Sequence, residues 1–185
     1  AQGRDAGAVN SIDNLSEHEI YELLKLQDAE AWRLAWEKAV LPEAAEFTDA
    51  EITDEIAALS GNDEIKEAYT ALDSSGEVVG ACVITETTGY DVGINTVTGV
   101  NADLAVSGVE ITSMKETPGL GAKAADESFR DQYDGKSGEV GVSKTGADDT
   151  HIEAISGATK TSNGVTRGVN LALRTAEILL EGGNE

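Results

Sequence analysis

The chain has 185 residues, of which 13 are basic and 35 are acidic, so its formal net charge is −22. This excess of acid excludes nucleic-acid binding through a basic surface and disfavours adsorption to an anionic membrane. Hydrophobic residues make up 40% of the chain, which is enough for the core of one domain. No stretch approaches the ~20 apolar residues of a membrane span. The single cysteine, Cys82, excludes an internal disulfide and is expected to be a buried, inert thiol.

A helical pattern begins the chain. Ser16 and Glu19 stand at the spacing of a capping box. Apolar residues then recur every three or four positions, which predicts a helix that ends near Ala39, before Pro42.

Short elements are predicted next. We expect a helix through Ala58, capped by Thr48 or Asp49, and residues 65–72 fit either a helix or a strand. Alternating apolar residues between glycines predict three strands, over residues 77–85, 92–100 and 104–113.

The last part of the chain closes on a long helix. A helical turn over 129–133 and a short strand over 140–142 precede a helix over 162–181, with Thr161, Ser162 and Asn163 as candidate N-caps. Strands enclosed by helices without βαβ repetition predict an α+β fold. We expect a small twisted, mostly antiparallel sheet flanked by helices. An N-terminal helical arm and linker (1–60) precedes one domain (61–185) that ends in the C-terminal helix.

One decapeptide, residues 153–162 (EAISGATKTS), places the hydroxyl of Thr159 on a run of small residues before that helix. Gly157 allows the backbone to bend and another protein to approach closely. Free N–H groups and the dipole at a helix start favour a phosphate. Because the sequence shows no clear activator for this weak nucleophile, the segment indicates either a site modified by a separate enzyme or an ordinary turn.

A second segment, residues 115–123 (KETPGLGAK), reads on its own as a loop. It contains one of two prolines in the chain, and Pro118-Gly119 is a strong turn signal.

Together, E-T-P-G-L-G and A-I-S-G-A-T-x-T-S resemble the motif pair of the FMN-binding domain family. The pair is similar to that of the G subunit of the Rnf electron-transport complex and of the related C subunit of the sodium-translocating NADH:quinone oxidoreductase. Further matches occur at residues 89–94, 129–136 and 34–47, and the resemblance covers roughly residues 70–185.

The resemblance implies the cofactor and its site. A flavin transferase is expected to attach FMN to Thr159 through a phosphoester bond. Around the phosphate we expect Ser156, Gly157, Ala158, Thr161 and Ser162. The residues expected to form a wall of the flavin pocket are Glu116, Thr117, Gly119, Leu120 and Gly121. No catalytic residue and no metal site are implied.

The resemblance also implies a function. The chain is expected to be an electron-transfer subunit of a membrane-bound, ion-pumping ferredoxin:NAD oxidoreductase, without stand-alone catalysis. It would act with other subunits of that complex on the extracytoplasmic side, held by an N-terminal membrane anchor that this sequence does not include. The alternatives are the C subunit of the quinone reductase and a non-redox extracytoplasmic module.

Two departures from the family pattern concern the site. Met114 stands where many members have a histidine, and Lys160 follows Thr159 where an apolar residue is common. Residues 115–185 hold 8 basic and 12 acidic side chains, against 5 and 23 in residues 1–114. We therefore hypothesise that some nearby cations face the FMN phosphate or ring carbonyls, the candidates being Lys115, Lys123, Lys160 and Arg167. His151, beside Asp149 and Glu153, is a weak alternative candidate for a metal ligand.

Overall fold

The structure is a computed structural model that describes residues 29–61 and 63–182. The chain divides into two units, residues 1–35 and 36–185, and the fold below is that of the second unit. The predicted capping box at Ser16 and Glu19 lies outside the described residues. The helix expected there ends as α2 (Ala29–Val40), one residue beyond the predicted end.

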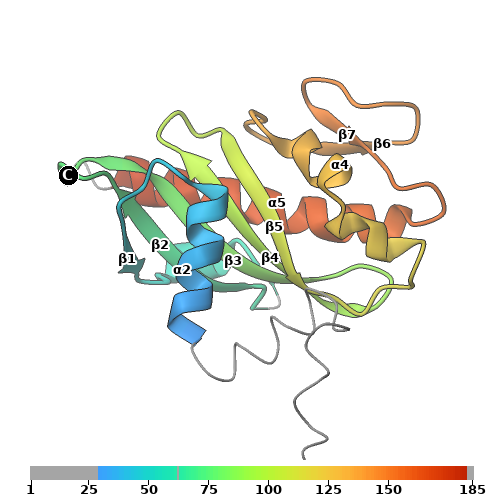
Figure 1. The fold of residues 1–185 in the computed structure, drawn as a ribbon, viewed down its shortest axis with the longest axis horizontal. Coiled ribbons are helices and arrows are strands. Elements are labelled where there is room, and N and C mark those ends of the chain that lie inside the picture. Colours follow the sequence, from blue (N-terminus) through green and yellow to red (C-terminus); the bar gives the residue numbers. More distant parts are fainter. Residues whose placement is uncertain (1–28, 62, 183–185) are drawn as a thin grey trace, which may run out of the picture. The chain divides into compact units, whose positions relative to one another are not determined.

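A five-stranded antiparallel sheet forms the centre of the fold (Figure 1). Each strand pairs with the next one in the chain, so the sheet is a simple meander. Its strands are β1 (Glu46–Ala50), β2 (Ile65–Leu72), β3 (Val78–Thr88), β4 (Val92–Asn101) and β5 (Val106–Ser113). With helices on the sheet and a C-terminal helix, the α+β prediction is confirmed.

Smaller elements complete the fold. A parallel pair of short strands, β6 (Gly141–Ser143) and β7 (His151–Glu153), follows the sheet in the chain. The remaining elements are α3 (Asp54–Ala58), η2 (Gly121–Ala125), α4 (Glu127–Arg130), η3 (Asp131–Tyr133) and α5 (Thr159–Glu181).

The helix predicted from Thr48 or Asp49 is wrong in its first half. Residues 46–50 instead form the edge strand β1, which pairs with β2 over its whole length. Helix α3 begins only at Asp54, where the Thr53 hydroxyl accepts a hydrogen bond from the Ile56 amide at 3.3 Å. Residues 65–72, left open between helix and strand, form β2.

Helix α5 begins three residues before the predicted start. Its N-cap is Ala158, which makes no side-chain capping bond. The hydroxyls expected to cap the helix have other partners: Thr161 donates to Glu116 at 2.7 Å, and Ser162 donates to the Ala158 carbonyl at 3.2 Å. Both hydroxyls therefore belong to the first turns of α5, which begins at Thr159.

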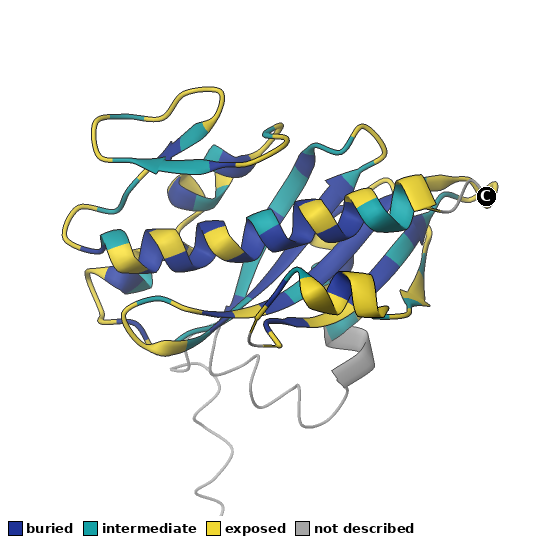
Figure 2. Cartoon of the chain, turned by 180° about the vertical axis from the view of Figure 1, so that it is seen from behind, coloured by how far each residue is buried: buried dark blue, intermediate teal, exposed yellow. Residues whose placement is uncertain are grey.

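Small residues let α5 lie directly on the sheet (Figure 2). The Thr87 hydroxyl donates to the Gly164 carbonyl at 2.8 Å. A Cβ at Gly168 would lie 2.6 Å from the Thr85 hydroxyl oxygen, so only glycine permits this approach. Val165 and Val169 are fully buried in the main core cluster. Among the described residues, no helix has both the length and the apolar character needed to cross a membrane.

The opposite face of the sheet is buried by the end of α2. Val40 packs with Tyr69, Cys82 and Val97, and the Ser107 hydroxyl donates to the Val40 carbonyl at 2.6 Å. Cys82 is buried and forms no disulfide, as predicted. With both faces of its central strands covered, the sheet holds the β3–β4 turn beside the start of α5.

Candidate functional site

A pocket of about 560 Å³ lies where α5 begins. This volume is in the range of small-molecule sites, which are about 300–1,000 Å³. Three segments that are distant in sequence form its walls: the β3–β4 turn, the loop after β5, and the first turn of α5. The lining residues are Tyr90, Glu116, Thr117, Leu120, Gly121, Gly157, Ala158, Thr159, Lys160 and Thr161.

Thr159 is the first residue of α5 and is half-buried at the pocket wall. Its hydroxyl has no hydrogen-bond partner among the described residues. The first N–H groups of a helix have no partner within the helix, and Ala158 supplies no side-chain cap here. The site therefore combines a reachable hydroxyl with a helix start that suits a phosphate.

The Glu116 carboxylate joins the three walls. Its Oε1 accepts hydrogen bonds from the Tyr90 and Asp91 amides at 3.0 and 3.1 Å. Its Oε2 accepts from the Thr161 hydroxyl at 2.7 Å. Only 7% of Glu116 is exposed, so these three donors take the place of water around the charge. We call Glu116 and its partners Tyr90, Asp91 and Thr161 the Glu116 clamp.

Two glycines allow the clamp to close. A Cβ at Gly121 would lie 2.6 Å from both Glu116 Oε2 and Thr161 Oγ1. A Cβ at Gly89 would lie 2.6 Å from Glu116 Oε1 and 3.0 Å from the Thr161 Cα. Real Cβ atoms do not approach other atoms this closely, so any larger residue would push the walls apart. The last glycine of E-T-P-G-L-G is thus needed for close packing.

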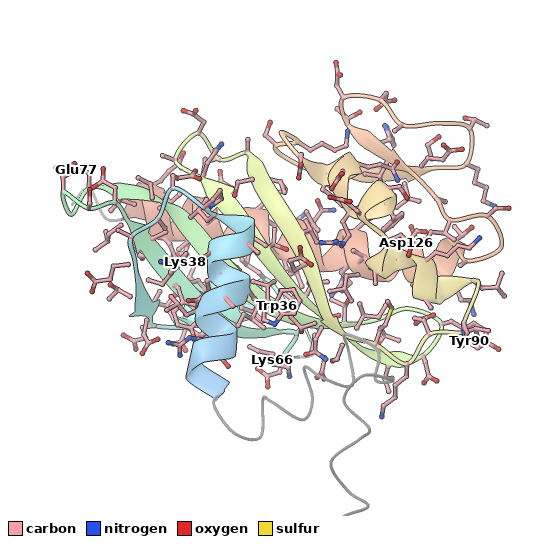
Figure 3. The ribbon with its side chains drawn as sticks, in the orientation of Figure 1. Trp36, Lys38, Lys66, Glu77, Tyr90 and Asp126 are labelled. Carbon is pink, nitrogen blue, oxygen red and sulfur yellow. The ribbon has the colours of Figure 1, made fainter. Side chains whose placement is uncertain are left out.

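Tyr90 and Lys160 stand at the pocket mouth. Figure 3 shows Tyr90 on the β3–β4 turn, where 73% of the residue is exposed. The Lys160 ammonium lies 5.5 Å from the centre of the Tyr90 ring, which is a cation–π distance. Lys160 makes no ion pair within the described residues. An exposed aromatic ring and a cation therefore flank the hydroxyl of Thr159.

Most predicted site residues meet at this pocket, but three do not line it. Ser162 is fully buried and accepts a hydrogen bond from the Ile155 amide at 3.0 Å, so it holds the turn that carries Thr159. Ser156 lines a neighbouring hollow with Lys123. Gly119 lies in the exposed turn next to the wall, with φ of +76°.

The four candidate cations have different surroundings. Lys160 lines the pocket, whereas Lys123 lines the neighbouring hollow. Arg167 is bound to Glu64 at 2.5 Å, and Lys115 is exposed. Of the four, Lys160 is the one placed to act on a ligand in the pocket.

His151 has a structural partner in the β6–β7 loop. Its Nδ1 lies 3.0 Å from the Asp148 carboxylate. The Thr150 amide and the His151 ring lower the pKa of Asp148 to about 2. Within residues 29–61 and 63–182, no three His, Cys, Asp or Glu side chains gather at a metal-binding distance.

Tyr90 is the lining residue that sequence reasoning missed. In the sequence, Gly89 and Tyr90 stand out only as part of the family resemblance at residues 89–94. Tyr90 lies between two predicted strands and follows a glycine, so its ring is expected to be exposed in a turn. An exposed aromatic ring is a candidate binding residue, and this was the signal in the sequence that could have identified Tyr90.

Comparison with known proteins places the chain in a family. The FMN-binding domain family matches residues 89–174, a span that holds the whole Glu116 clamp and Thr159. The G subunit of the Na(+)-translocating ferredoxin:NAD(+) oxidoreductase complex of Acetobacterium woodii is 40% identical over 152 residues, which are 76% of this chain and 72% of that protein. The chain belongs to the G-subunit family of FMN-binding proteins.

Two further G-subunit proteins are similar to this chain and support the same family assignment. The G subunit of the ion-translocating oxidoreductase complex of Methanosarcina acetivorans is 34% identical over 155 residues, covering 81% of this chain and 77% of that protein. The G subunit of the proton-translocating ferredoxin:NAD(+) oxidoreductase complex of Clostridium ljungdahlii is 37% identical over 109 residues, 58% of this chain and 59% of that protein.

Solved structures share the fold of this G-subunit protein. NqrC of Shewanella oneidensis has a TM-score of 0.51 at 23% identity, covering 77% of this chain and 73% of that chain. The C subunit of the Na(+)-translocating NADH-quinone reductase of Parabacteroides distasonis has a TM-score of 0.50 at 20% identity, covering 85% of this chain and 96% of that chain. At these identities the likeness concerns the fold alone.

Proposed function

We propose that this protein is the covalent flavin carrier of a membrane-bound, ion-translocating ferredoxin:NAD oxidoreductase. FMN is joined to Thr159 through a phosphoester bond, and the protein relays electrons between redox centres of partner subunits. The observation that carries the proposal is the hydroxyl of Thr159, which has no hydrogen-bond partner among the described residues. It stands at an uncapped helix start beside a pocket of about 560 Å³.

The residues present fit an FMN group. Leu120, Ala158 and the Tyr90 ring offer apolar surface for a flat ring system, and the open N–H groups of α5 suit a phosphate. Lys160 supplies a positive charge beside the attachment point. The bound flavin supplies the redox chemistry, whereas the protein supplies position and electrostatics.

Attachment requires a separate flavin transferase. In the transfer, the Thr159 oxygen forms a new bond to the FMN phosphorus of FAD, the pyrophosphate bond breaks, and AMP leaves. The hydroxyl proton passes to a base of the transferase, because this chain offers no basic group hydrogen-bonded to Thr159 among its described residues. Exposure of Ser156 and Gly157 before the helix leaves the segment open to such an enzyme.

Location and complex belong to the same proposal. We place the domain on the extracytoplasmic side, attached through an N-terminal anchor beyond the given sequence. The identity of 34–40% to G-subunit proteins supports this complex over the quinone reductase, because the likeness to the C subunit of that reductase rests on fold alone.

Replacing Thr159 tests the attachment. On co-production with a flavin transferase, Thr159→Ala should abolish the flavin fluorescence that stays with the protein on a denaturing gel. Its thermal unfolding should change little, since loss of a hydroxyl near a helix start costs at most ~1–2 kcal/mol. Ser128→Ala, which removes an exposed hydroxyl of α4 outside both motifs, serves as the matched control and should remain fluorescent. Fluorescence retained by Thr159→Ala would reject Thr159 as the attachment site.

A further inference from the structure

Glu116 is buried where its side chain joins the three pocket walls. Its two carboxylate oxygens hold the β3–β4 turn on one side and helix α5 on the other. We propose that Glu116 is the positioning residue of the flavin pocket. Its carboxylate sets the spacing between the Tyr90 wall and the Thr159 helix start, and so decides whether the attached ring is seated in the pocket. This inference rests on the proposed function.

The two oxygens have separate tasks. Oε1 receives two consecutive backbone amides, those of Tyr90 and Asp91, and this fixes the course of the turn that carries the aromatic ring. Oε2 receives the Thr161 hydroxyl, two residues after Thr159 on the same helix. Movement of either wall therefore has to break a hydrogen bond to a buried charge, which is stronger than a bond between neutral groups.

The clamp has little room for a substitute. Gly89 and Gly121 bring backbone close to both carboxylate oxygens. With an aspartate at position 116, the side chain would be one C–C bond shorter, so its carboxylate would not reach the hydrogen-bond donors of the clamp. Removal of the side chain would leave the Tyr90 and Asp91 amides without their protein acceptor.

The fold itself does not depend on the clamp. Strands β3 and β4 pair from Gly80 to Thr88, and α5 is held by Val165 and Val169 in the main core. Loss of the Glu116 carboxylate should therefore loosen the pocket while the sheet and α5 remain in place. A purely structural role would instead lower stability and leave the flavin environment unchanged in the molecules that still fold.

Three variants separate geometry from charge. Glu116→Ala removes both sets of bonds. Glu116→Gln keeps an oxygen for the two amides, and its NH₂ group can donate to the Thr161 oxygen, so it preserves the geometry without the charge. Thr161→Val breaks the helix side alone. Glu127→Ala, at an exposed acidic residue of α4, is the matched control.

The first measurement uses flavin-free protein, and therefore does not depend on the proposed function. Amide hydrogen exchange followed by NMR should show protection of Tyr90 and Asp91 falling about tenfold or more in Glu116→Ala. Protection should be kept in Glu116→Gln, Thr161→Val and Glu127→Ala, with core amides of β3 unchanged in all four. Wild-type protection in a folded Glu116→Ala would overturn the inference, as would full loss in Glu116→Gln.

The second measurement uses the flavin-loaded protein. Visible circular dichroism of the flavin should be largely lost in Glu116→Ala, weakened in Thr161→Val, and kept in Glu116→Gln. Glu116→Gln should raise the midpoint potential, because a negative charge that opposes flavin reduction is gone. If wild type takes up no flavin, the proposed function fails. If wild type is loaded and Glu116→Ala shows the same dichroism, only the inference on Glu116 fails.

Discussion

Individual residues of the pocket are constrained by contacts that differ from one to the next. Gly121 is required for space, because its Cβ would overlap two atoms of the Glu116 clamp. Lys160 is free of ion pairs within the described part of the chain, and we propose that it acts on the flavin through its charge. These two kinds of constraint predict different outcomes of substitution.

Gly121→Ala should destabilise the protein by about 1–3 kcal/mol, because the added methyl overpacks the clamp. Gly182→Ala is the control, since no atom lies within 4 Å of its Cβ position and its backbone is helical. The control should change stability by less than ~0.5 kcal/mol. Urea unfolding measures the free energy of unfolding of both variants. Equal values for Gly121→Ala and Gly182→Ala would show that the Glu116 clamp accommodates the added methyl group without loss of stability.

Lys160→Gln should lower the midpoint potential of the bound flavin by about 10–40 mV, the range expected for an exposed ionic interaction. The cation favours the reduced, more negative flavin, so its loss disfavours reduction. Lys123→Gln, in the neighbouring hollow, should leave the potential unchanged. Potentiometric titration measures the midpoint potential of both variants. Equal shifts in Lys160→Gln and Lys123→Gln would contradict a specific effect of the cation that lines the pocket.

At the scale of elements, one ion pair ties the start of β2 to α5. Arg167 Nε donates to both oxygens of Glu64 at 2.8 and 2.9 Å. The hydrogen bond from Arg167 lowers the pKa of Glu64 below its usual value and raises the pKa of Arg167. A carboxyl with a lowered folded pKa stabilises the fold above its unfolded pKa, and this contribution disappears as pH falls through the folded pKa.

Glu64→Gln should therefore cost most at neutral pH, about 1 kcal/mol for this partly exposed pair. The difference from wild type should shrink as pH falls through the lowered pKa of Glu64, because the wild-type carboxyl then becomes protonated. Chemical unfolding at several pH values between 7 and 3 measures it. A difference that stays constant with pH would mean that the Glu64 charge adds nothing to stability.

Element prediction succeeded where periodicity is long and failed where tertiary contacts decide. The three central strands and the C-terminal helix follow from repeated apolar spacing. Strand β1 was missed because three of its five residues are polar and none is buried, so pairing with β2 alone defines it. The start of α5 was misplaced because Thr161 and Ser162 have good capping side chains, whereas Thr161 donates to Glu116, a residue 45 positions earlier in the chain.

At the scale of the whole molecule, the fold gathers segments that are far apart in sequence. Tyr90, Glu116 and Thr159 meet at one pocket, and the two motifs predicted that a site exists there. Its third wall, the β3–β4 turn, could not be predicted because it depends on the register of β3 against β4. The chain has a net charge of −22, and yet a positively charged residue, Lys160, lines this pocket.

The central claim is that Thr159 carries FMN. The most direct test is the intact mass of protein co-produced with an active flavin transferase, followed by peptide mapping. The account predicts one added FMN minus water, located on the peptide that contains Thr159. An unmodified mass, from a transferase that modifies a known acceptor in the same cells, would contradict it and leave the segment as a structural turn.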